Sequence, residues 1–472
     1  MIKFGTDGWR AVIAEGFTFE NVRLVSQAVA NYLLETTSTK PLEVVIGFDT
    51  RFLSDRFAAE VAQVMAANGI IAHLARADAP TPAISYNIVH KHAIGGVMIT
   101  ASHNPPRYNG FKLKAAYGGS ASKEQTQAVQ ERLVGVQKAK IMDYNKAIDN
   151  GLIRRFDPAW PYYEHLTSNL IDMDIIHNGE LDVVVDSMYG AGRGVLREIL
   201  SRTRTKVHEL HGEMNPGFGG LHPEPLGRNL RQLIGTVQNT HVHLGVATDG
   251  DADRIGAVDE RGNFVDPHTI MSLAVRYLVE KRGLRGAIAK TISSTLMLNR
   301  LGKKYNLPVY ETPVGFDLIA DYMIKDDVLL GGEESGGISI KGHIPEGDGI
   351  LMSLLLMEIV AEARVPFSEL IADLQQHFGP TVYERHDLHL DAPVSKREMV
   401  ARLVAAAPAT IAGESVVKVD SYDGVKYHLA DDSWLLIRPS GTEPVLRVYA
   451  EGNSREAVKA MLEAGQRLVN LT

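Results

Sequence analysis

The sequence predicts an α/β protein that carries a separate α+β unit at its C-terminal end. Short β-branched runs alternate with helical patterns as far as about residue 380, which favours parallel sheets covered by helices. Beyond that point, strands joined by turns precede one long helical stretch. The chain has 472 residues, of which 45% are apolar and 22% charged, an ordinary globular composition. We therefore expect roughly three or four domains.

The strand-and-helix units follow one another along the chain. The run from residue 42 to 51, "LEVVIGFDTR", precedes a helical stretch that should end at Gly69, since glycine commonly terminates helices. The run 181–194 leads into the helix "VLREIL", and 242–254 is a third unit. Runs this continuously apolar suit strands buried on both faces. Within the second unit, "GAGRG" at 190–194 lacks the full spacing of a dinucleotide-binding loop, so we interpret it as a tight strand-to-helix turn.

The C-terminal part has a different pattern. "SVVKVDSYDGVKYHL" and "SWLLIRPSGTEPVLRVYAEG" indicate strands joined by turns, and "SREAVKAMLEAGQRLVNL" has helical spacing. Two other segments, "FDPAWPYYEHL" near residue 156 and "DERGNFVDP" near 263, combine proline, glycine and polar residues and are plausible joints between domains.

Charge and composition exclude several classes of protein. The net charge of -8 disfavours non-specific binding to nucleic acid. The absence of cysteine excludes disulfides, thiolate catalysis and cysteine-based zinc sites. The start "MIKFGTDGWRAVI" lacks the long apolar run of a signal peptide, and no stretch approaches a membrane span of about 20 apolar residues. We therefore expect a cytoplasmic protein with no membrane partner. The P-loop and HExxH motifs are also missing.

The segment "TDGDADR" places Asp249, Asp251 and Asp253 at alternate positions. Carboxylates this close repel one another unless a cation lies between them, so a hard divalent metal is the natural interpretation. The alternative is an acidic solvated turn. An EF-hand is disfavoured because its sixth position requires glycine, whereas Arg254 stands there. Arg254 is instead suitably charged to bind an anion.

The segment "IRPSGTEPVLR" follows the strand "WLLI" and has the composition of an anion site. Ser440, Gly441 and Thr442 offer two hydroxyls and backbone N–H groups, while Arg438 adds a bidentate grip on phosphate. Hydrogen bonds to a charged group contribute roughly 1.5–3 kcal/mol each, so this loop could hold one phosphate. A polar hairpin turn explains Ser-Gly-Thr equally well, but it explains Arg438 and Arg447 less well.

The segment "LLGGEESGGISI" lies between apolar runs. Glu333 and Ser335, flanked by glycines, could bind two neighbouring sugar hydroxyls, because a carboxylate accepts two hydrogen bonds and glycine lets a ligand approach the backbone. On its own, this segment is better explained by a flexible turn with a solvated carboxylate.

The segment "MITASHNPP" at residues 98–106 ends an apolar run at a serine and a histidine. Serine, asparagine and proline are ordinary turn residues. The alternative is that Ser102 is a nucleophile or phosphate carrier at the mouth of a site. A Ser-His-Asp hydrolase would normally carry a G-x-S-x-G elbow, which this sequence lacks.

Taken together and in this order, the four segments resemble the α-D-phosphohexomutase family over essentially the whole chain. "TASHNP" looks like the phosphoserine loop, "DGDADR" the metal loop, "GEESG" the sugar loop and "RPSGTEP" the phosphate loop, and "FGTDGWR" and "YNGFKLK" also match. The resemblance implies three related α/β domains with mixed sheets, plus a C-terminal α+β domain, around a central cleft. The expected domains are 1–155 with the phosphoserine loop, 156–262 with the metal loop, 263–378 with the sugar loop and 379–472 with the phosphate loop.

The same resemblance implies a phosphoryl group on Ser102, which would be donated to a sugar monophosphate to form a 1,6-bisphosphate intermediate. Mg²⁺ would be bound by Ser102, Asp249, Asp251 and Asp253. Lys112 is the first candidate for the general acid or base and His103 its rival, and Arg10 and Arg254 would surround the same phosphate. The implied substrate-binding residues are Lys290, Thr312, Gly315, Glu333, Ser335, Arg438, Ser440, Gly441 and Thr442. Closure of the C-terminal domain over the cleft is expected to keep water from the phosphoryl group.

The favoured activity is interconversion of glucose 1-phosphate and glucose 6-phosphate, with glucose 1,6-bisphosphate as activator and hexose phosphates as the partners. "TASHNP" is similar to glucose and mannose mutases, so a phosphomannomutase or dual-specificity mutase is the first alternative. Phosphoglucosamine mutase, a non-catalytic sugar-phosphate sensor and a metal-dependent phosphatase are more remote. The sequence leaves open whether the protein is a monomer or a dimer, how it is regulated and whether Ser102 is phosphorylated.

Overall fold

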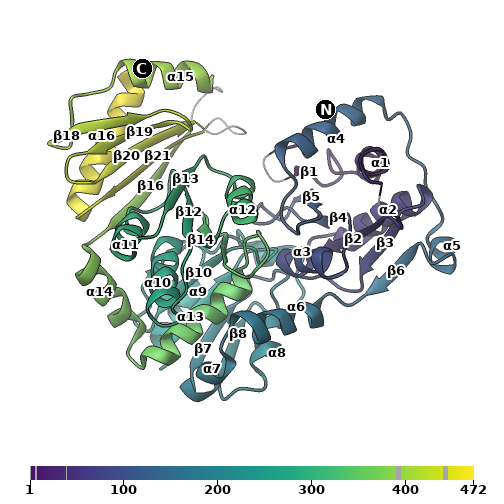
Figure 1. The fold of residues 1–472 in the computed structure, drawn as a ribbon, viewed down its shortest axis with the longest axis horizontal. Helices are drawn as coiled ribbons and strands as arrows, with labels where there is room; N and C mark the ends of the chain where they lie inside the picture. Colours follow the sequence, from purple (N-terminus) through teal and green to yellow (C-terminus); the bar gives the residue numbers. More distant parts are fainter. Residues whose placement is uncertain (1, 6–7, 39, 390–394, 440–444, 472) are drawn as a thin grey trace.

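The computed structural model describes residues 2–5, 8–38, 40–389, 395–439 and 445–471. Its strands form four sheets (Figure 1). The first sheet and the C-terminal sheet lie on opposite sides of the molecule, with the second and third sheets between them (Figure 1). Each of the first three sheets mixes parallel and antiparallel pairs, and the fourth is antiparallel throughout its described strands, which confirms the predicted fold class.

The first sheet has the strand order β1-β5-β4-β2-β3-β6. Strands β4, β2, β3 and β6 are parallel, while β5 runs antiparallel to both β1 and β4. The strands are β1 (Trp9–Val12), β2 (Glu43–Phe48), β3 (Ile71–Ala75), β4 (Gly95–Ile99), β5 (Tyr108–Ala115) and β6 (Ile153–Phe156). The helices are α1 (Phe19–Thr36), α2 (Ser54–Ala67), α3 (Thr81–His90), α4 (Lys123–Gly135) and α5 (Tyr144–Asp149). Gly69 has φ +74 just beyond α2, which confirms the expected helix end.

The second sheet has the order β11-β10-β9-β7-β8, in which β9, β7 and β8 are parallel. The strands are β7 (Asp182–Asp186), β8 (Lys206–Leu210), β9 (Leu244–Thr248), β10 (Ile255–Asp259) and β11 (Phe264–Val265). The associated helices are α6 (Ala159–His165), a π-helical turn η1 (Leu166–Leu170), α7 (Met173–Gly179), α8 (Val195–Leu200), a short 3-10 turn η2 (Phe218–Gly220) and α9 (Arg231–Asn239). The metal loop predicted from the sequence connects β9 to β10.

The third sheet has the order β13-β12-β14-β15, with β15 antiparallel to β14. Its strands are β12 (Ala287–Thr291), β13 (Val309–Thr312), β14 (Val328–Gly332) and β15 (Ile338–Ile340). Its helices are α10 (Pro267–Glu280), α11 (Met297–Tyr305), α12 (Phe316–Lys325), α13 (Gly349–Ala363) and α14 (Phe367–Phe378). Helix α10 begins where Asp266 accepts a hydrogen bond from the Thr269 N–H and Pro267 occupies the first turn, both ordinary helix-start signals.

The C-terminal sheet has the order β16-β21-β20-β19-β18-β17. Its strands are β16 (Val382–His389), β17 (Thr410–Ile411), β18 (Glu414–Asp420), β19 (Val425–Leu429), β20 (Trp434–Pro439) and β21 (Val445–Gly452). Helix α16 (Arg455–Leu471) packs against β16, β20 and β21, and α15 (Lys396–Ala405) against β19. This arrangement confirms the predicted α+β unit.

The second and third sheets share one continuous hydrophobic core, whereas the first and C-terminal sheets have their own. Helix α13 is apolar on almost every face and contacts β9 and β10 of the second sheet and β15 of the third. A helix that is apolar all round must be buried between layers. These two sheets therefore form one central body that carries both the predicted metal loop and the predicted sugar loop.

Candidate active site

The loop after β4 presents Ser102 in the left-handed conformation, with φ +48. This conformation is uncommon for a non-glycine residue and has to be held by its surroundings. The buried guanidinium of Arg51 supplies that support. It donates to the carbonyl oxygens of Ser102 at 2.5 Å, Asn104 at 2.6 Å, Pro105 at 2.9 Å and Tyr108 at 3.0 Å.

Arg51 is itself held from below by Asp49, whose Oδ2 lies 3.2 Å from Arg51 Nε. Asp49 also accepts hydrogen bonds from Thr100 and Ser54, both buried. Neither Asp49 nor Arg51 was expected from the sequence, although "FDTR" stands at the end of the buried strand β2. Polar residues at the carboxyl end of a buried parallel strand are a signal that could have identified them.

The loop after β9 brings its three carboxylates together with Ser102. The Ser102 hydroxyl donates to Asp249 Oδ2 at 2.7 Å, and one oxygen from each of Asp249, Asp251 and Asp253 lies within 4.8 Å of the other two. Asp251 Oδ1 and Asp253 Oδ1 are buried without a hydrogen-bond partner. Buried carboxylate oxygens without partners are costly. This donor set therefore fits a hard divalent cation.

Two residues outside the loop contact the same carboxylates. Lys112 on β5 places Nζ 3.0 Å from Asp251 Oδ2 and 2.8 Å from Asp253 Oδ2. Thr81, at the start of α3, donates its hydroxyl to Asp251 Oδ2 at 2.7 Å. The structure therefore joins Lys112 to the acidic cluster, and it adds Thr81, which no sequence pattern indicated.

Burial and neighbouring charges shift the pKa values of these groups in different directions. Burial, reinforced by Asp253 and Asp251, raises the pKa of Asp249 well above its usual range. Burial would also raise the pKa of Asp251, but the charge of Lys112 and the hydrogen bonds that Asp251 accepts, including that from Thr81, together lower that pKa below its usual value. Burial, together with the positive charges of Arg254 and Arg10, holds the pKa of His103 well below its usual range, so its imidazole is neutral near pH 7.

The serine and metal loops pass each other at close range. A Cβ atom on Gly250 would lie 2.5 Å from the carbonyl oxygen of Ser102, so only glycine fits there without displacement. Arg254 closes the metal loop by placing Nε 3.9 Å from Asp253 Oδ1 and Nη1 3.5 Å from Glu224. Arg10 reaches the serine loop from β1 and donates to Asn104 Oδ1 at 2.6 Å.

The sugar loop follows β14 and has Glu333 at its centre. Glu333 Oε1 accepts the Gly315 N–H at 3.0 Å, and the Ser335 hydroxyl donates to Oε2 at 3.3 Å. Burial raises the pKa of Glu333 to about 7, although the positive charge of Arg254 opposes this shift. The predicted neighbours Gly315, Glu333 and Ser335 therefore lie together, and they are electrostatically linked to the metal loop through Arg254.

Lys290 and Thr312 lie at the ends of β12 and β13, beside the C-terminal sheet. The Lys290 ammonium donates to the carbonyl oxygens of Ser294 and Thr295 and lies 3.3 Å from Glu311. Glu311 also pairs with Lys426 of the C-terminal sheet at 3.1 Å. Lys290 is thus engaged in the joint between the third and fourth sheets.

Arg438 at the end of β20 is oriented by Asp423, whose Oδ2 accepts from Arg438 Nε at 2.8 Å. The same oxygen accepts the Val314 N–H at 3.0 Å, one residue before Gly315. Arg438 is therefore tied to the segment that also holds Glu333. The other predicted members of the phosphate loop, Ser440, Gly441 and Thr442, lie outside the described residues.

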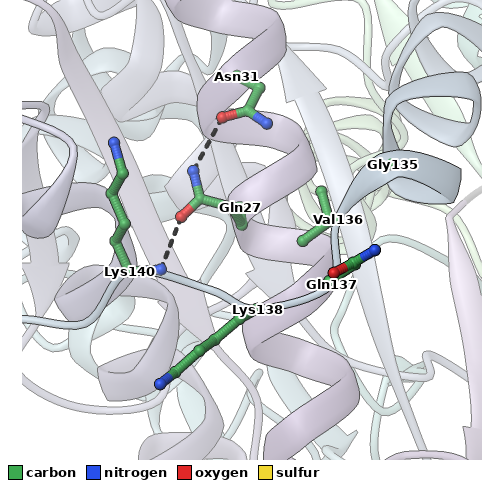
Figure 2. Close-up of a pocket in the computed structure, with 7 residues that line it drawn as sticks. All are labelled: Gln27, Asn31, Gly135, Val136, Gln137, Lys138 and Lys140. Atoms are coloured by element: carbon green, nitrogen blue, oxygen red, sulfur yellow. Dashed lines mark hydrogen bonds between the residues drawn. The ribbon is translucent and has the colours of Figure 1, made fainter.

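A separate cavity of about 320 Å³ lies between α1 and the segment that follows α4. It is lined by Gln27, Asn31, Gly135, Val136, Gln137, Lys138 and Lys140 (Figure 2). The Gln27 side chain donates a hydrogen bond to Asn31 and accepts one from the backbone N–H of Lys140 (Figure 2). None of the residues that surround Ser102, the three aspartates or Glu333 lines this cavity.

Comparison with known proteins identifies the family. Family models described as phosphoglucomutase/phosphomannomutase α/β/α domains I, II and III match residues 1–140, 160–262 and 266–378, and the model of the C-terminal domain matches 393–464. A phosphoglucomutase/phosphomannomutase of Thermococcus kodakarensis is 32% identical over 99% of this chain and 98% of its own. The chain belongs to the phosphoglucomutase/phosphomannomutase family.

Other members of the family extend the comparison. A phosphoglucosamine mutase of Carboxydothermus hydrogenoformans is 30% identical over 98% of this chain and 97% of its own. The crystal structure of a "putative phosphomannomutase" of Thermus thermophilus has a TM-score of 0.87 and 35% identity, covering 99% of both chains. An Aspergillus fumigatus N-acetylphosphoglucosamine mutase, solved with GlcNAc-6P and magnesium, shares the fold at 17% identity and a TM-score of 0.59, covering 100% of this chain and 95% of its own.

The protein is therefore an α-D-phosphohexomutase, an enzyme that moves a phosphoryl group within its substrate. The family membership predicted from the sequence is confirmed. Among the residues that the structure describes, no helix has both the length and the apolar character that a membrane crossing requires. The individual residue roles and the domain limits 1–155, 156–262, 263–378 and 379–472 remain predictions.

Proposed function

We propose that this phosphohexomutase interconverts glucose 1-phosphate and glucose 6-phosphate through a phosphoserine at position 102. The observation that carries the proposal is the 2.7 Å contact between the Ser102 hydroxyl and Asp249, within a cluster of three buried carboxylates. A serine next to carboxylates alone is a poor nucleophile. The same serine on a cation site is well placed to carry and transfer a phosphoryl group, because phosphoryl transfer depends on positioning and charge neutralisation.

Asp249, Asp251 and Asp253 would hold Mg²⁺, with an oxygen of phosphorylated Ser102 as a further ligand. When bound, the cation neutralises charge that builds up on the transferring phosphoryl group. Two observations support this assignment: Asp251 and Asp253 each have a buried oxygen that accepts no hydrogen bond, and magnesium is bound in the structure of the Aspergillus fumigatus homologue. Arg254 and Arg10 would add positive charge around the same phosphate.

In the first half of the reaction, the phosphoryl group leaves Ser102 Oγ for the free hydroxyl of the bound sugar monophosphate. The sugar hydroxyl loses its proton to a base, Ser102 Oγ takes up a proton from an acid as its bond to phosphorus breaks, and a glucose 1,6-bisphosphate intermediate forms. The intermediate then turns over, and its other phosphoryl group passes to Ser102, which regenerates the phosphoenzyme. Both halves use the same residues, so the site must accept the sugar in two orientations.

Lys112 remains the first candidate for the general acid or base. Its amine lies within 3.0 Å of the carboxylates that surround Ser102. His103 is the rival, and its imidazole lies 3.4 Å from the Ser102 hydroxyl. The lowered pKa of His103 leaves its imidazole unprotonated and a weak proton acceptor, whereas the Lys112 ammonium beside two carboxylates is suited to donate a proton. We expect Lys112→Met to reduce turnover more than His103→Gln does.

Glu333 and Ser335 would bind the O3 and O4 hydroxyls of the sugar in either orientation. Glu333 is already oriented by the Gly315 N–H, which supports a fixed acceptor geometry. Arg438, Ser440, Gly441 and Thr442 would bind the phosphate that is not reacting, and Lys290, Thr312 and Gly315 would complete the substrate site. Closure of the C-terminal domain would bring its phosphate-binding residues onto the sugar phosphate and exclude water.

The choice of sugar is the finer part of the proposal. O3 and O4 are oriented alike in glucose and mannose, so a phosphomannomutase or a dual-specificity mutase is the first alternative. The phosphoglucosamine mutases among the relatives make that substrate a second alternative. The complete acidic cluster and its contact with Ser102 argue against a non-catalytic sensor, because binding alone needs no phosphoryl carrier.

The experiment that tests the proposal compares sugars. Purified protein with Mg²⁺ and a trace of glucose 1,6-bisphosphate is given glucose 1-phosphate, mannose 1-phosphate or glucosamine 1-phosphate, beside a Ser102→Ala control. We expect glucose 6-phosphate to form fastest, with the control slower by several orders of magnitude. A faster mannose or glucosamine reaction would reassign the substrate. Release of free phosphate without isomerisation would indicate a phosphatase. No turnover of any of the three sugar phosphates would leave the non-catalytic sensor as the remaining interpretation.

A further inference from the structure

We propose that His165 and His343 are positioning residues, which set two helices against the loop that carries Asp249, Asp251 and Asp253. Neither histidine touches those carboxylates, and no sequence motif includes either of them. The inference rests on the proposed cation site for its effect on metal affinity, but the positioning itself is a property of the protein alone. It follows from a chain of hydrogen bonds.

The hydrogen-bond chain defines the tautomers of both histidines. His343 Nε2 lies 2.9 Å from Asp348 Oδ2, and the side chains of both residues are fully buried. An ionised carboxylate only accepts hydrogen bonds, so His343 donates from Nε2 and a neutral ring then accepts at Nδ1. His165 Nε2 lies 3.0 Å from that Nδ1 and must be the donor. The amide of Asn169, 3.3 Å from His165 Nδ1, completes the chain.

Asp348 is fully satisfied at the other end of this chain. Tyr162 donates its hydroxyl to both oxygens, at 2.9 and 2.8 Å. Asp348 Oδ1 also accepts the Leu351 N–H at 2.8 Å, which makes Asp348 the N-cap of α13. The histidine chain is thus anchored to the first turn of the helix that lies between the second and third sheets.

The first residues of two helices, α3 and α13, donate hydrogen bonds to the metal loop. At the start of α3, the Thr81 N–H donates to the carbonyl oxygen of Asp251 at 2.8 Å, beside the side-chain bond already described. At the start of α13, the Gly349 N–H donates to the carbonyl oxygen of Ala252 at 3.0 Å. A Cβ atom on Gly349 would overlap the carbonyl oxygen of Arg254, so the approach is close. The partial positive charge of a helix N-terminus favours a negative loop.

The two histidines connect these helices. The His165 ring stacks on Tyr86 of α3 at 4.4 Å between centroids and on His343 at 5.2 Å. His343 in turn bonds the residue that caps α13. Tyr86, His165, His343 and Asp348 therefore form a strut from α3 to α13, the two helices whose first residues donate to the metal loop. Loss of the strut should let the loop shift, although the three aspartates themselves are unchanged.

The test compares His343→Leu and His165→Leu with the wild type and with His343→Gln, which keeps a donor for Asp348. His73→Leu is the matched control, because His73 is also buried and paired with a carboxylate, Glu43 at 2.6 Å, but on the far strands of the first sheet. Mg²⁺ affinity is measured by calorimetry and Mn²⁺ affinity by electron paramagnetic resonance. Intact mass establishes that all variants carry the same number of phosphoryl groups.

We expect both leucine variants to weaken Mg²⁺ binding about tenfold, His343→Gln to restore part of the affinity and His73→Leu to leave it unchanged. Amide hydrogen exchange in the peptide 244–254 should accelerate in the two leucine variants and not in the control. Wild-type affinity and exchange in both leucine variants would overturn the positioning role. If the wild type itself bound no divalent cation, the proposed metal site would be wrong, and the exchange data would still decide the positioning role.

Discussion

At the scale of single residues, Arg51 is the main support of the loop that carries Ser102. Four carbonyl oxygens of the serine loop depend on its planar guanidinium, which lysine cannot replace because its ammonium is a single point with three donors. We expect Arg51→Lys to lower kcat by about 10- to 100-fold and the free energy of unfolding by about 2–4 kcal/mol, since buried acceptors lose their donors. Steady-state kinetics and urea unfolding measure the two effects.

The matched control for that substitution is Arg23→Lys. Arg23 forms a two-pronged pair with Glu60, at 2.7 and 3.0 Å, but its side chain is partly exposed and contacts no part of the site. Exposed pairs of this kind contribute about 0–1 kcal/mol. An Arg51→Lys enzyme with the stability and turnover of Arg23→Lys would contradict the role assigned to Arg51.

Glu333 provides a prediction about pH. The role proposed for Glu333 requires its carboxylate form, and with a pKa of about 7 it is mostly protonated at pH 6 and mostly ionised at pH 8. The ionised fraction rises about tenfold between these values. We expect KM for the sugar phosphate to fall several-fold over that range and to change less in Glu333→Gln. Equal pH dependence in the two enzymes would argue against Glu333 as the hydroxyl acceptor.

The raised pKa of Glu333 also affects the stability of the folded protein. The folded pKa lies above the ordinary value of 4.5, so the folded state holds the Glu333 proton more tightly than the unfolded state does. The contribution of Glu333 to the free energy of unfolding is therefore fully present below about pH 4.5 and is lost as the pH rises to about 7. Because the side chain is partly exposed, we expect Glu333→Gln to gain about 1 kcal/mol relative to the wild type between pH 5 and pH 8, measured by urea unfolding.

At the scale of elements, the proposed reaction requires the loop that carries Ser102 to lie close to the loop that carries the three aspartates. Gly250 follows β9, and an added Cβ there would lie 2.5 Å from the Ser102 carbonyl. We expect Gly250→Ala to push the serine loop away from the metal loop and to lower kcat at least tenfold, since a displacement of about 1 Å can cost 100-fold. Gly135→Ala is the control, because open space surrounds Gly135 at the end of α4. Similar turnover in both variants would show that the loops tolerate separation.

The placement of these loops follows from the topology of the sheets. The segments after β2, β4, β9, β12 and β14 all begin at the carboxyl ends of buried strands, where open α/β sheets bind their ligands. The segments after β4, β9 and β14 could be identified from the sequence because Ser102, the three aspartates and Glu333 have distinctive chemistry. Asp49 and Arg51 carry a weaker signal, their position at the end of a buried strand, whereas Thr81 carries none, because a threonine before a proline is an ordinary helix start.

At the scale of the whole molecule, the second and third sheets should unfold as one body. Leu355 on α13 is fully buried in the core that they share. We expect Leu355→Ala to cost about 2–5 kcal/mol and to reduce amide protection in β9 and β12 alike, while β2 of the first sheet is unaffected. Hydrogen exchange with mass spectrometry measures all three strands in one experiment.

Leu435→Ala is the corresponding control in the C-terminal core, where the buried side chain packs with its own sheet. Its effect should be confined to β19, β20 and β21. Loss of protection in the second sheet alone after Leu355→Ala would mean that the two central sheets open independently. A shared opening would support the view that the metal loop and the sugar loop move as one unit.

The fold class, the family and the chemical character of four loops could all be predicted from the order of the amino acids alone. Strand and helix patterns are local properties, and a serine, three alternate aspartates and a glycine-flanked glutamate keep their chemistry wherever the chain places them. The contacts among these loops, such as Ser102 with Asp249 and Lys112 with Asp253, join residues 147 and 141 positions apart. No local pattern specifies such distances.

The residues that support those loops could be recognised only in the folded chain. Arg51 beneath the serine loop, Thr81 on the metal loop and the His165–His343 strut are ordinary residues in the sequence, and their roles arise from burial and from partners on other elements. The pKa of Glu333, about 7, likewise depends on packing around it. The physical reason is common to all of them: the energy of a buried polar group is set by neighbours that the folded chain brings from distant positions.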